Sequence, residues 1–359
     1  MKTANLTSVA IAALLGIIML AGAGCTNSKT NQETSDNMET LNLTQEWDKK
    51  FPQSDKVNHR KVTFKNRYGI ILAADLYEPK NVEGKLAAIA VSGPFGAVKE
   101  QASGLYAQTM AERGFLTLAF DPSYTGESGG EPRNVASPDI NTEDFSAAVD
   151  FLTALPNVDA ERIGIIGICG FGGMGLNAAA MDTRIKATVA STMYDMSRVN
   201  ANGYFDAEDS ADDRNKKREM MNVIRTRDAQ SGTITPGVHG LPDSITGEEP
   251  QFVKDYFDYY KTNRGFHVRS INSNGAWNPT MTLSFINMPL LSYIHEISRP
   301  VLLIHGENAH SRYFSEDAFK KLTGDNKELM IIPGANHTDL YDRTIPFDKL
   351  EDFFRKNLK

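Results

Sequence analysis

Residues 162–175 read Arg-Ile-Gly-Ile-Ile-Gly-Ile-Cys-Gly-Phe-Gly-Gly-Met-Gly, and the run Leu-Asn-Ala-Ala-Ala-Met follows directly. The apolar run 163–168 is typical of a buried parallel strand, and the alanine-rich run indicates a helix. Because the helix begins almost at once, Cys169 must lie at a tight turn, for which Gly167 and Gly170 leave room. The stretch therefore predicts a strand–nucleophile–helix elbow with cysteine in the place that serine usually takes.

A cysteine at such a turn has chemical consequences. Backbone N–H groups at a helix N-terminus favour a thiolate and the oxyanion that forms when it attacks a carbonyl. Other interpretations remain open, because Phe171 stands where the usual elbow has glycine and free cysteines are often simply buried apolar side chains. A glycine-rich turn can also hold a phosphate, but the chain lacks the P-loop pattern and a well-spaced dinucleotide fingerprint.

The N-terminus indicates export. Met1-Lys2 is followed by an uncharged stretch with an apolar centre, and small residues precede Cys25. This order is typical of a secretory signal and resembles a bacterial lipoprotein cleavage box, although Gly22 stands where a larger aliphatic residue is usual. We expect a signal peptide over 1–24, lipid on Cys25, and a protein anchored in the bacterial cell envelope, periplasmic or surface-exposed. An uncleaved anchor helix is the alternative, since the uncharged stretch is long enough to span a bilayer.

Composition narrows the rest of the chain. It has two cysteines, so lipid on Cys25 leaves Cys169 as the free thiol of the mature protein. The polar segment 25–42 predicts a disordered tether, and the remainder has a globular composition.

A net charge of −7 without a basic patch argues against a nucleic-acid partner. The histidines are scattered and no His-Glu-x-x-His occurs, so neither a metal nor an organic cofactor is implied. Nothing in the sequence indicates an oligomeric state.

Apolar runs alternate with helical patterns along the chain. Strands are expected at 57–64, 70–77, 86–91, 115–120, 163–168, 185–191, 300–306 and 328–332, with helices at 101–113, 141–155, 315–322 and near the C-terminus. This alternation predicts an α/β fold with a mostly parallel, doubly wound sheet. It stops in a polar segment that we interpret as an inserted helical cap over the C-terminal edge of the sheet. The domain boundaries are then 43–196 and 286–359 for the core and 197–285 for the cap.

Five motifs in order carry a family resemblance: Gly93-Pro-Phe-Gly96, Asp121-Pro-Ser-Tyr-Thr-Gly-Glu-Ser128, Gly167-Ile-Cys169, His305-Gly306 and Gly334-Ala-Asn-His337. Over residues 55–359 the chain resembles an α/β-hydrolase, nearest to the cysteine-dependent dienelactone-hydrolase-like branch. The resemblance implies that Cys169 attacks an acyl carbonyl to give a thioester intermediate. It implies that His337, in the loop after the last strand, is the general base.

The acid that orients the base is less clear. The family places it a few residues beyond His305-Gly306, where this chain has Glu307 and no aspartate. Asp195, beyond the strand that follows the elbow helix, is the other position from which this fold can supply it. A cysteine nucleophile can also work with a weak or absent acid, because a thiol ionises easily. Both carboxylates stay open, with Glu307 slightly preferred.

The loop after the early strand supplies the rest of the predicted site. The oxyanion hole is expected to use the N–H groups of Gly170 and Phe95, since Pro94 has none. Dienelactone hydrolases hold the resting thiol with a glutamate in this loop, where Gly93 stands here. Tyr204, Tyr256 and Trp277 in the cap are candidates for a substrate pocket, although aromatic residues at such spacing are more often core.

These residues predict a hydrolase that cleaves a small-molecule ester, lactone or thioester through Cys169 and His337. Two alternatives are an exported serine-peptidase-like hydrolase acting on peptide bonds, and a non-catalytic surface lipoprotein that binds an acyl compound. The cap decides specificity, so the sequence does not select among these substrates.

The lipid anchor is testable by itself. The variant Cys25→Ser should lose membrane association, because the thiol that accepts the lipid is gone. Detergent partitioning and mass spectrometry of the mature protein measure this. The same variant with lipid still attached would contradict the predicted anchor.

Overall fold

The computed structural model describes residues 41–80 and 82–359, which lie in one compact unit. The predicted signal peptide 1–24, the lipid site Cys25 and nearly all of the predicted tether 25–42 fall outside the described residues. Among the residues described, no helix combines the length and the apolar character needed to cross a membrane.

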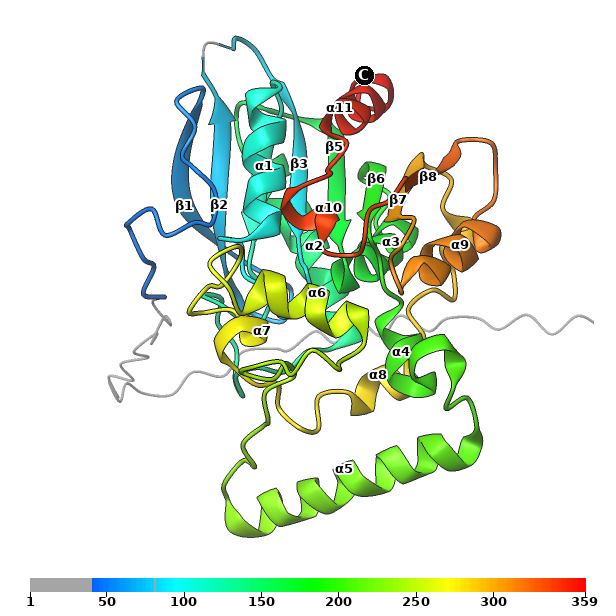
Figure 1. The fold of residues 1–359 in the computed structure, drawn as a ribbon. Helices are drawn as coiled ribbons and strands as arrows, with labels where there is room; N and C mark the ends of the chain where they lie inside the picture. Colours follow the sequence, from blue (N-terminus) through cyan, green and yellow to red (C-terminus); the bar gives the residue numbers. More distant parts are fainter. Residues whose placement is uncertain (1–40, 81) are drawn as a thin grey trace, which may run out of the picture. The chain divides into compact units, whose positions relative to one another are not determined.

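An eight-stranded sheet forms the centre of the protein, in the order β1-β2-β4-β3-β5-β6-β7-β8 (Figure 1). Its strands are β1 (Val57–Lys65), β2 (Ile71–Pro79), β3 (Leu86–Ser92), β4 (Leu116–Phe120), β5 (Val158–Ile168), β6 (Ile185–Ser191), β7 (Val301–Gly306) and β8 (Lys327–Ile332). All neighbours from β4 onward pair in parallel, and β2 pairs antiparallel with both β1 and β4. The predicted fold class, a mostly parallel α/β-hydrolase sheet, is confirmed.

Helices cover both faces of the sheet. One face packs against α1 (Ala102–Glu112) and α11 (Phe347–Asn357), and the other against α2 (Pro138–Thr153), α3 (Gly170–Met181) and α9 (Arg312–Lys321). The central strands β3 and β5 are therefore buried on both sides, which explains why they read as continuous apolar runs rather than alternating ones.

Local chemistry shifts several element boundaries from the predicted ones. Helix α2 begins three residues before the expected Asn141, because the Ser137 side chain accepts a hydrogen bond from the Ile140 N–H and Pro138 suits the first helical position. Strand β5 begins at Val158, five residues before the apolar run, because Val158 pairs with Leu86 of β3 and an irregularity separates this pair from the regular pairing that starts at Ile163.

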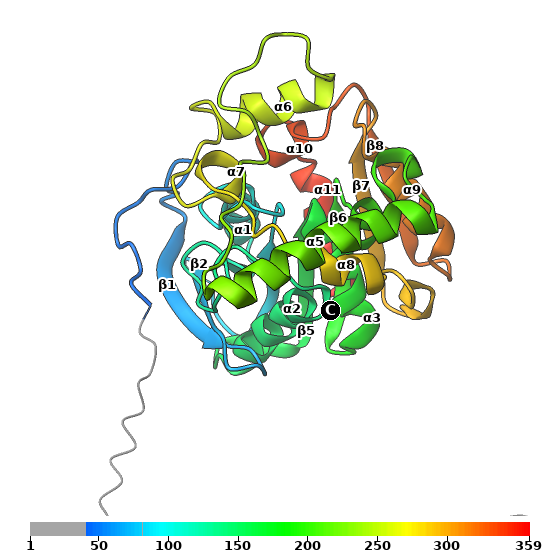
Figure 2. The same ribbon diagram turned by 90° about the horizontal axis from the view of Figure 1, so that it is seen from below.

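The segment between β6 and β7 contains no strand. Its helices are α4 (Met196–Asn202), α5 (Ala211–Ser231), α6 (Gln251–Tyr260), α7 (Ile271–Asn274) and α8 (Leu283–Asn287), with single turns at Tyr204–Asp206 and Ile294–Glu296. Figure 1 shows these helices gathered beyond one end of the sheet, with α5 farthest out. Figure 2, the view from below, shows α5 running across α8. The two helices are in contact. This insertion occupies the region in which the cap was expected.

A buried cluster of charges ties together the loops after β3 and β4. The ammonium of Lys99 is fully buried and lies 2.7 Å from Glu100, 2.9 Å from Asp121 and 2.6 Å from Glu127. Burial opposes ionisation of Glu127, but Lys99 and Lys61 outweigh it and lower the pKa of that carboxyl to about 2. The pKa of Glu100 also lies well below its usual range, because the nearby cations overcome the effect of burial.

This cluster makes stability depend on Lys99. Removing one partner of a buried ion pair typically costs about 3–5 kcal/mol, so Lys99→Met should lose stability on that scale in urea denaturation near neutral pH. Carboxyls with lowered folded-state pKa values stabilise the fold above their ordinary pKa of 4.5 and lose this contribution as the pH falls. The stability lost in Lys99→Met should therefore become smaller as the pH falls toward about 4.5, because carboxyls that no longer face Lys99 take up protons there.

The matched control is Lys186→Met. Lys186 pairs with Glu161, whose side chain is 82% exposed, so this variant should lose less than about 1 kcal/mol. Equal losses in the two variants would show that the buried cluster does not stabilise the fold as argued.

Candidate active site

Cys169 lies in the turn between β5 and α3. Its backbone has φ 56° and ψ −125°, a left-handed conformation that residues other than glycine rarely adopt. The turn is held by backbone hydrogen bonds of 2.9 Å from the Cys169 N–H to the Ser191 carbonyl and from the Tyr194 N–H to the Cys169 carbonyl. A Cβ on Gly167 would lie 2.1 Å from the Phe171 carbonyl oxygen, so only glycine fits there. The predicted strand–turn–helix geometry, with Cys169 at the turn, is present in the structure.

Three polar groups lie beside the thiol of Cys169. They are the backbone N–H groups of Phe95 and Gly170 and the hydroxyl of Tyr341, and all three favour the ionised form of the thiol. The structure thus brings both expected oxyanion-hole residues to the sulfur. Burial raises the pKa of the thiol above its ordinary 9.0, and these three groups oppose the rise without cancelling it. The resting side chain is therefore a neutral thiol at neutral pH.

The cap fixes the loop that carries Phe95. The amide of Asn272 donates to the Phe95 carbonyl over 2.8 Å, and the Asn272 N–H donates to the Gly96 carbonyl over 3.1 Å. At Gly93 a Cβ would lie 2.2 Å from the Ile168 carbonyl oxygen, so no side chain fits at that position. The thiol is held instead by Tyr341, which lies in the short helix α10 (Asp339–Asp342).

His337 is fully buried in the loop after β8 and reaches the thiol through Tyr341. Its Nε2 lies 3.0 Å from the Tyr341 hydroxyl, which in turn lies beside the Cys169 thiol. Its Nδ1 lies 2.6 Å from the Ser311 hydroxyl and 2.9 Å from the Thr192 hydroxyl. A proton on Nδ1 satisfies the serine and leaves the Nε2 lone pair for the tyrosine. Burial lowers the pKa of His337 well below 6.5, so the ring is a neutral base.

Neither carboxylate expected beside His337 lies there. The Glu307 carboxylate is in an exposed loop and accepts the Gly334 N–H over 2.8 Å. Asp195 caps α4, accepting the Arg198 N–H over 3.0 Å and the Ser197 hydroxyl over 2.5 Å. Each carboxylate is thus occupied with a backbone N–H at the start of a turn or helix, a common use of acidic side chains.

A chain of neutral groups takes the position of the acid. Ser311 bonds to His337 on one side and to His305 Nε2 over 2.9 Å on the other, and His305 Nδ1 lies 2.6 Å from the Ser315 hydroxyl. Burial lowers the pKa of His305 to about 3, so this histidine is neutral as well. Ser311, Thr192 and Tyr341 were not predicted from the sequence. One signal was available for Tyr341: it follows His337 by four residues, the spacing of side chains on one face of a helix.

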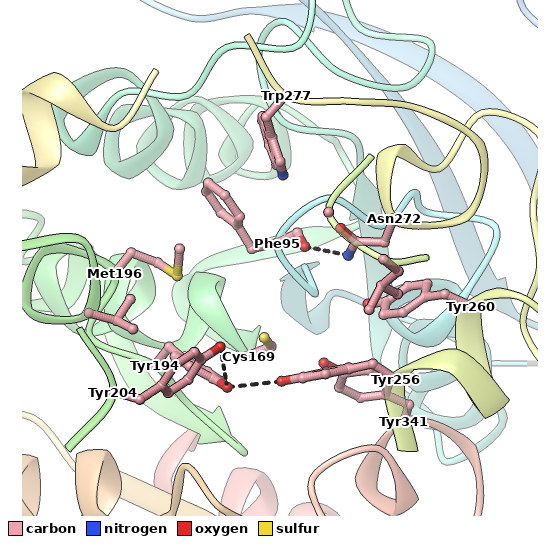
Figure 3. A pocket seen from close by; sticks show the side chains of 13 residues that line it. Phe95, Cys169, Tyr194, Met196, Tyr204, Tyr256, Tyr260, Asn272, Trp277 and Tyr341 are labelled. Carbon is pink, nitrogen blue, oxygen red and sulfur yellow. Dashed lines mark hydrogen bonds between the residues drawn. The ribbon is translucent and has the colours of Figure 1, made fainter. Parts of the chain in front are cut away.

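A cavity of about 230 Å³ opens over the thiol (Figure 3). The candidate pocket residues Tyr204, Tyr256 and Trp277 all line it. Aromatic rings make up most of its wall, and Phe95 stacks on Trp277 with 4.4 Å between ring centroids. None of the described residues that line this cavity carries a formal charge. Such a site suits a neutral, largely apolar ligand.

Comparison with known proteins places this geometry in a family. The model of the X-Pro dipeptidyl-peptidase (S15) family matches residues 68–339. An uncharacterised Pseudomonas aeruginosa protein, PA2218, is 60% identical over 96% of this chain and 94% of its own. Its crystal structure aligns with a TM-score of 0.85 at 63% identity, over 89% of this chain and 99% of that one.

Two more distant proteins complete the comparison. The thiohydrolase AneE of Aspergillus aculeatus is 35% identical over 29% of this chain and 32% of its own. The α/β hydrolase GrgF of Penicillium shares the fold, with a TM-score of 0.70 at 20% identity over 84% of this chain and 99% of that one. The dienelactone-hydrolase-like branch stays a prediction from the motifs. The chain belongs to the X-Pro dipeptidyl-peptidase (S15) family and is a hydrolase of the α/β-hydrolase fold.

Proposed function

We propose that this protein hydrolyses esters, lactones or thioesters of neutral acyl groups, thioesters foremost, with Cys169 as the nucleophile. The observation that carries the proposal is the position of the thiol. It lies at the elbow, beneath an uncharged aromatic cavity, with two backbone N–H groups directed at its sulfur. A partial relative named as a thiohydrolase supports the reaction class.

The Tyr341 hydroxyl, beside the thiol and in contact with His337, offers a route for the proton. As the sulfur bonds to the acyl carbon, the thiol proton passes to the Tyr341 oxygen while the Tyr341 proton moves to His337 Nε2. The carbonyl π electrons become an oxyanion that the N–H groups of Phe95 and Gly170 stabilise. Collapse expels the thiolate or alkoxide, which takes the proton back along the same route. Water then attacks the acyl-enzyme, losing its proton to His337, and the thiol leaves with that proton.

A peptide substrate is the second candidate, because the matching family is described by a dipeptidyl-peptidase activity. A dipeptidyl substrate presents a free α-amino cation near the bond that breaks. Burying this cation without a carboxylate partner is costly, and no acidic side chain is among the described residues lining the cavity. This argues for a neutral acyl group over a peptide N-terminus. A protein that only binds an acyl compound would have the same cavity but no turnover.

The nucleophile is tested by removing the thiol. Cys169→Ala should abolish thioester turnover while the melting temperature changes little, because the side chain is small and one point mutation typically costs about 1 kcal/mol. In the wild-type protein, a base whose pKa lies well below 6.5 and a thiol whose pKa lies above 9.0 predict a flat kcat/KM between these two pH values. Turnover in Cys169→Ala, or a rise of kcat/KM through pH 7, would contradict the mechanism.

Which side chains orient His337 is tested by measuring kcat for four variants. Glu307→Gln and Asp195→Asn should remain near wild type, since neither side chain contacts His337 and asparagine is a good helix cap. Ser311→Ala should lower kcat by about tenfold, less than the loss of the buried aspartate in a serine triad, because the serine is neutral. His337→Ala should lose the most. A tenfold loss in either carboxylate variant would identify that residue as the acid.

A further inference from the structure

Three tyrosine hydroxyls and a histidine meet on one wall of the cavity. The Tyr194 hydroxyl lies 2.5 Å from His310 Nε2, 3.0 Å from the Tyr256 hydroxyl and 3.5 Å from the Tyr204 hydroxyl. Figure 3 shows these hydroxyls on the side of Cys169 away from Phe95 and Trp277. All three tyrosines line the cavity.

His310 has no part in the proposed proton route. Its ring is stacked on Phe252 with 4.5 Å between centroids and lies edge-on to Tyr256, so its orientation is fixed by packing. Burial lowers its pKa to about 4, and burial also raises the pKa values of Tyr194 and Tyr256 well above 10. The cluster is therefore neutral at physiological pH. It is a buried polar group that catalysis through Tyr341 and His337 does not require.

The hydrogen-bonding capacity of the cluster is not used up by its own contacts. Each phenol has one donor and two acceptor lone pairs, and a neutral imidazole has one donor and one acceptor. The Tyr194 hydroxyl donates to the Tyr204 hydroxyl over 3.5 Å, so His310 Nε2 and the Tyr256 hydroxyl donate to Tyr194. Tyr204 then keeps its proton and a lone pair for the cavity, and Tyr256 keeps a lone pair. A ligand hydroxyl suits this arrangement, because it both donates and accepts.

The other wall is apolar. Phe95 and Trp277 stack with an interplanar angle of 25°, and Met196 lies beside them in the cavity lining. Cys169 lies between this wall and the hydroxyl cluster (Figure 3). An acyl group held here has its carbonyl at the thiol, its apolar body against the aromatic pair, and any polar substituent within reach of the tyrosines.

We propose that the acyl group taken by this site is a neutral one that carries a hydroxyl, and that Tyr204 and Tyr256, held in place by Tyr194 and His310, bind this hydroxyl. The proposal rests on the acyl-hydrolase function proposed above and names its substrate class. A site built around hydrogen-bonding groups discriminates strongly against a ligand that leaves them unpaired in an apolar cavity.

The test uses the full chain and two matched thioesters, the N-acetylcysteamine esters of 4-hydroxyphenylacetic acid and phenylacetic acid. We expect kcat/KM to favour the hydroxylated ester by at least about tenfold in the wild type. In Tyr194→Phe this ratio should fall toward one, because the ring remains but the hydroxyl that holds Tyr204 and Tyr256 in place is gone. Tyr293→Phe is the matched control and should keep the wild-type ratio, since Tyr293 is 63% exposed and does not line the cavity.

Binding separates this inference from the proposed function. The neutral amides 4-hydroxyphenylacetamide and phenylacetamide are titrated into Cys169→Ala by calorimetry, which requires no turnover. Tighter binding of the hydroxylated amide, lost on adding Tyr194→Phe, supports the substrate class even if neither thioester is cleaved, in which case only the proposed reaction fails. Cleavage of both esters at equal kcat/KM, or equal or absent binding of the amides, overturns the inference.

Discussion

The left-handed turn at Cys169 is the constraint on which the site depends. A non-glycine residue with φ 56° is held there only because the surrounding backbone leaves it no alternative. A Cβ at Gly173 would lie 2.3 Å from the Tyr194 carbonyl oxygen, so α3 packs directly on the segment after β6. That close approach aims the thiol away from the sheet, into the cavity. The same turn presents the N–H of Gly170, and the adjacent loop contributes that of Phe95, so nucleophile and donors are positioned together.

The position of the Phe95 N–H, the second of these donors, depends on the buried charge cluster around Lys99. The Asp121 carboxylate accepts the backbone N–H of Lys99 over 2.7 Å and that of Glu127 over 2.9 Å, while pairing with the Lys99 ammonium. These contacts join the loop after β3, which carries Phe95, to the loop after β4. A buried ion pair adds little stability compared with a well-packed apolar core, but it defines one geometry and penalises others. In this protein it fixes a loop whose backbone must stay aligned with the thiol.

The sequence predicted the parts of the fold that periodicity and turn chemistry determine. The eight strands, their mostly parallel pairing, and the turn at Cys169 follow from apolar runs and glycines. The thiol and the N–H groups of Phe95 and Gly170 are brought together as expected, because the C-terminal ends of neighbouring parallel strands meet at one edge. The contacts of His337 did not follow, since they join residues distant in sequence. Ser311 and Thr192 carry hydroxyl groups, and in a sequence a buried serine or threonine looks the same as one on the surface. Glu307 was predicted only from its position after β7.

The neutral surroundings of His337 give a physical reason for a cysteine at the elbow. In a serine triad, a buried carboxylate stabilises the imidazolium that forms when the histidine takes the proton. Here hydroxyl groups and a second neutral histidine surround the ring, and burial keeps its pKa far below 6.5. Such a base is weak. A thiol needs a weaker base than an alcohol does, because it ionises far more readily and its sulfur is the better nucleophile. On the proposed mechanism, the cysteine and the missing carboxylate thus belong together, because a thiol can give its proton to a weak base that no carboxylate supports.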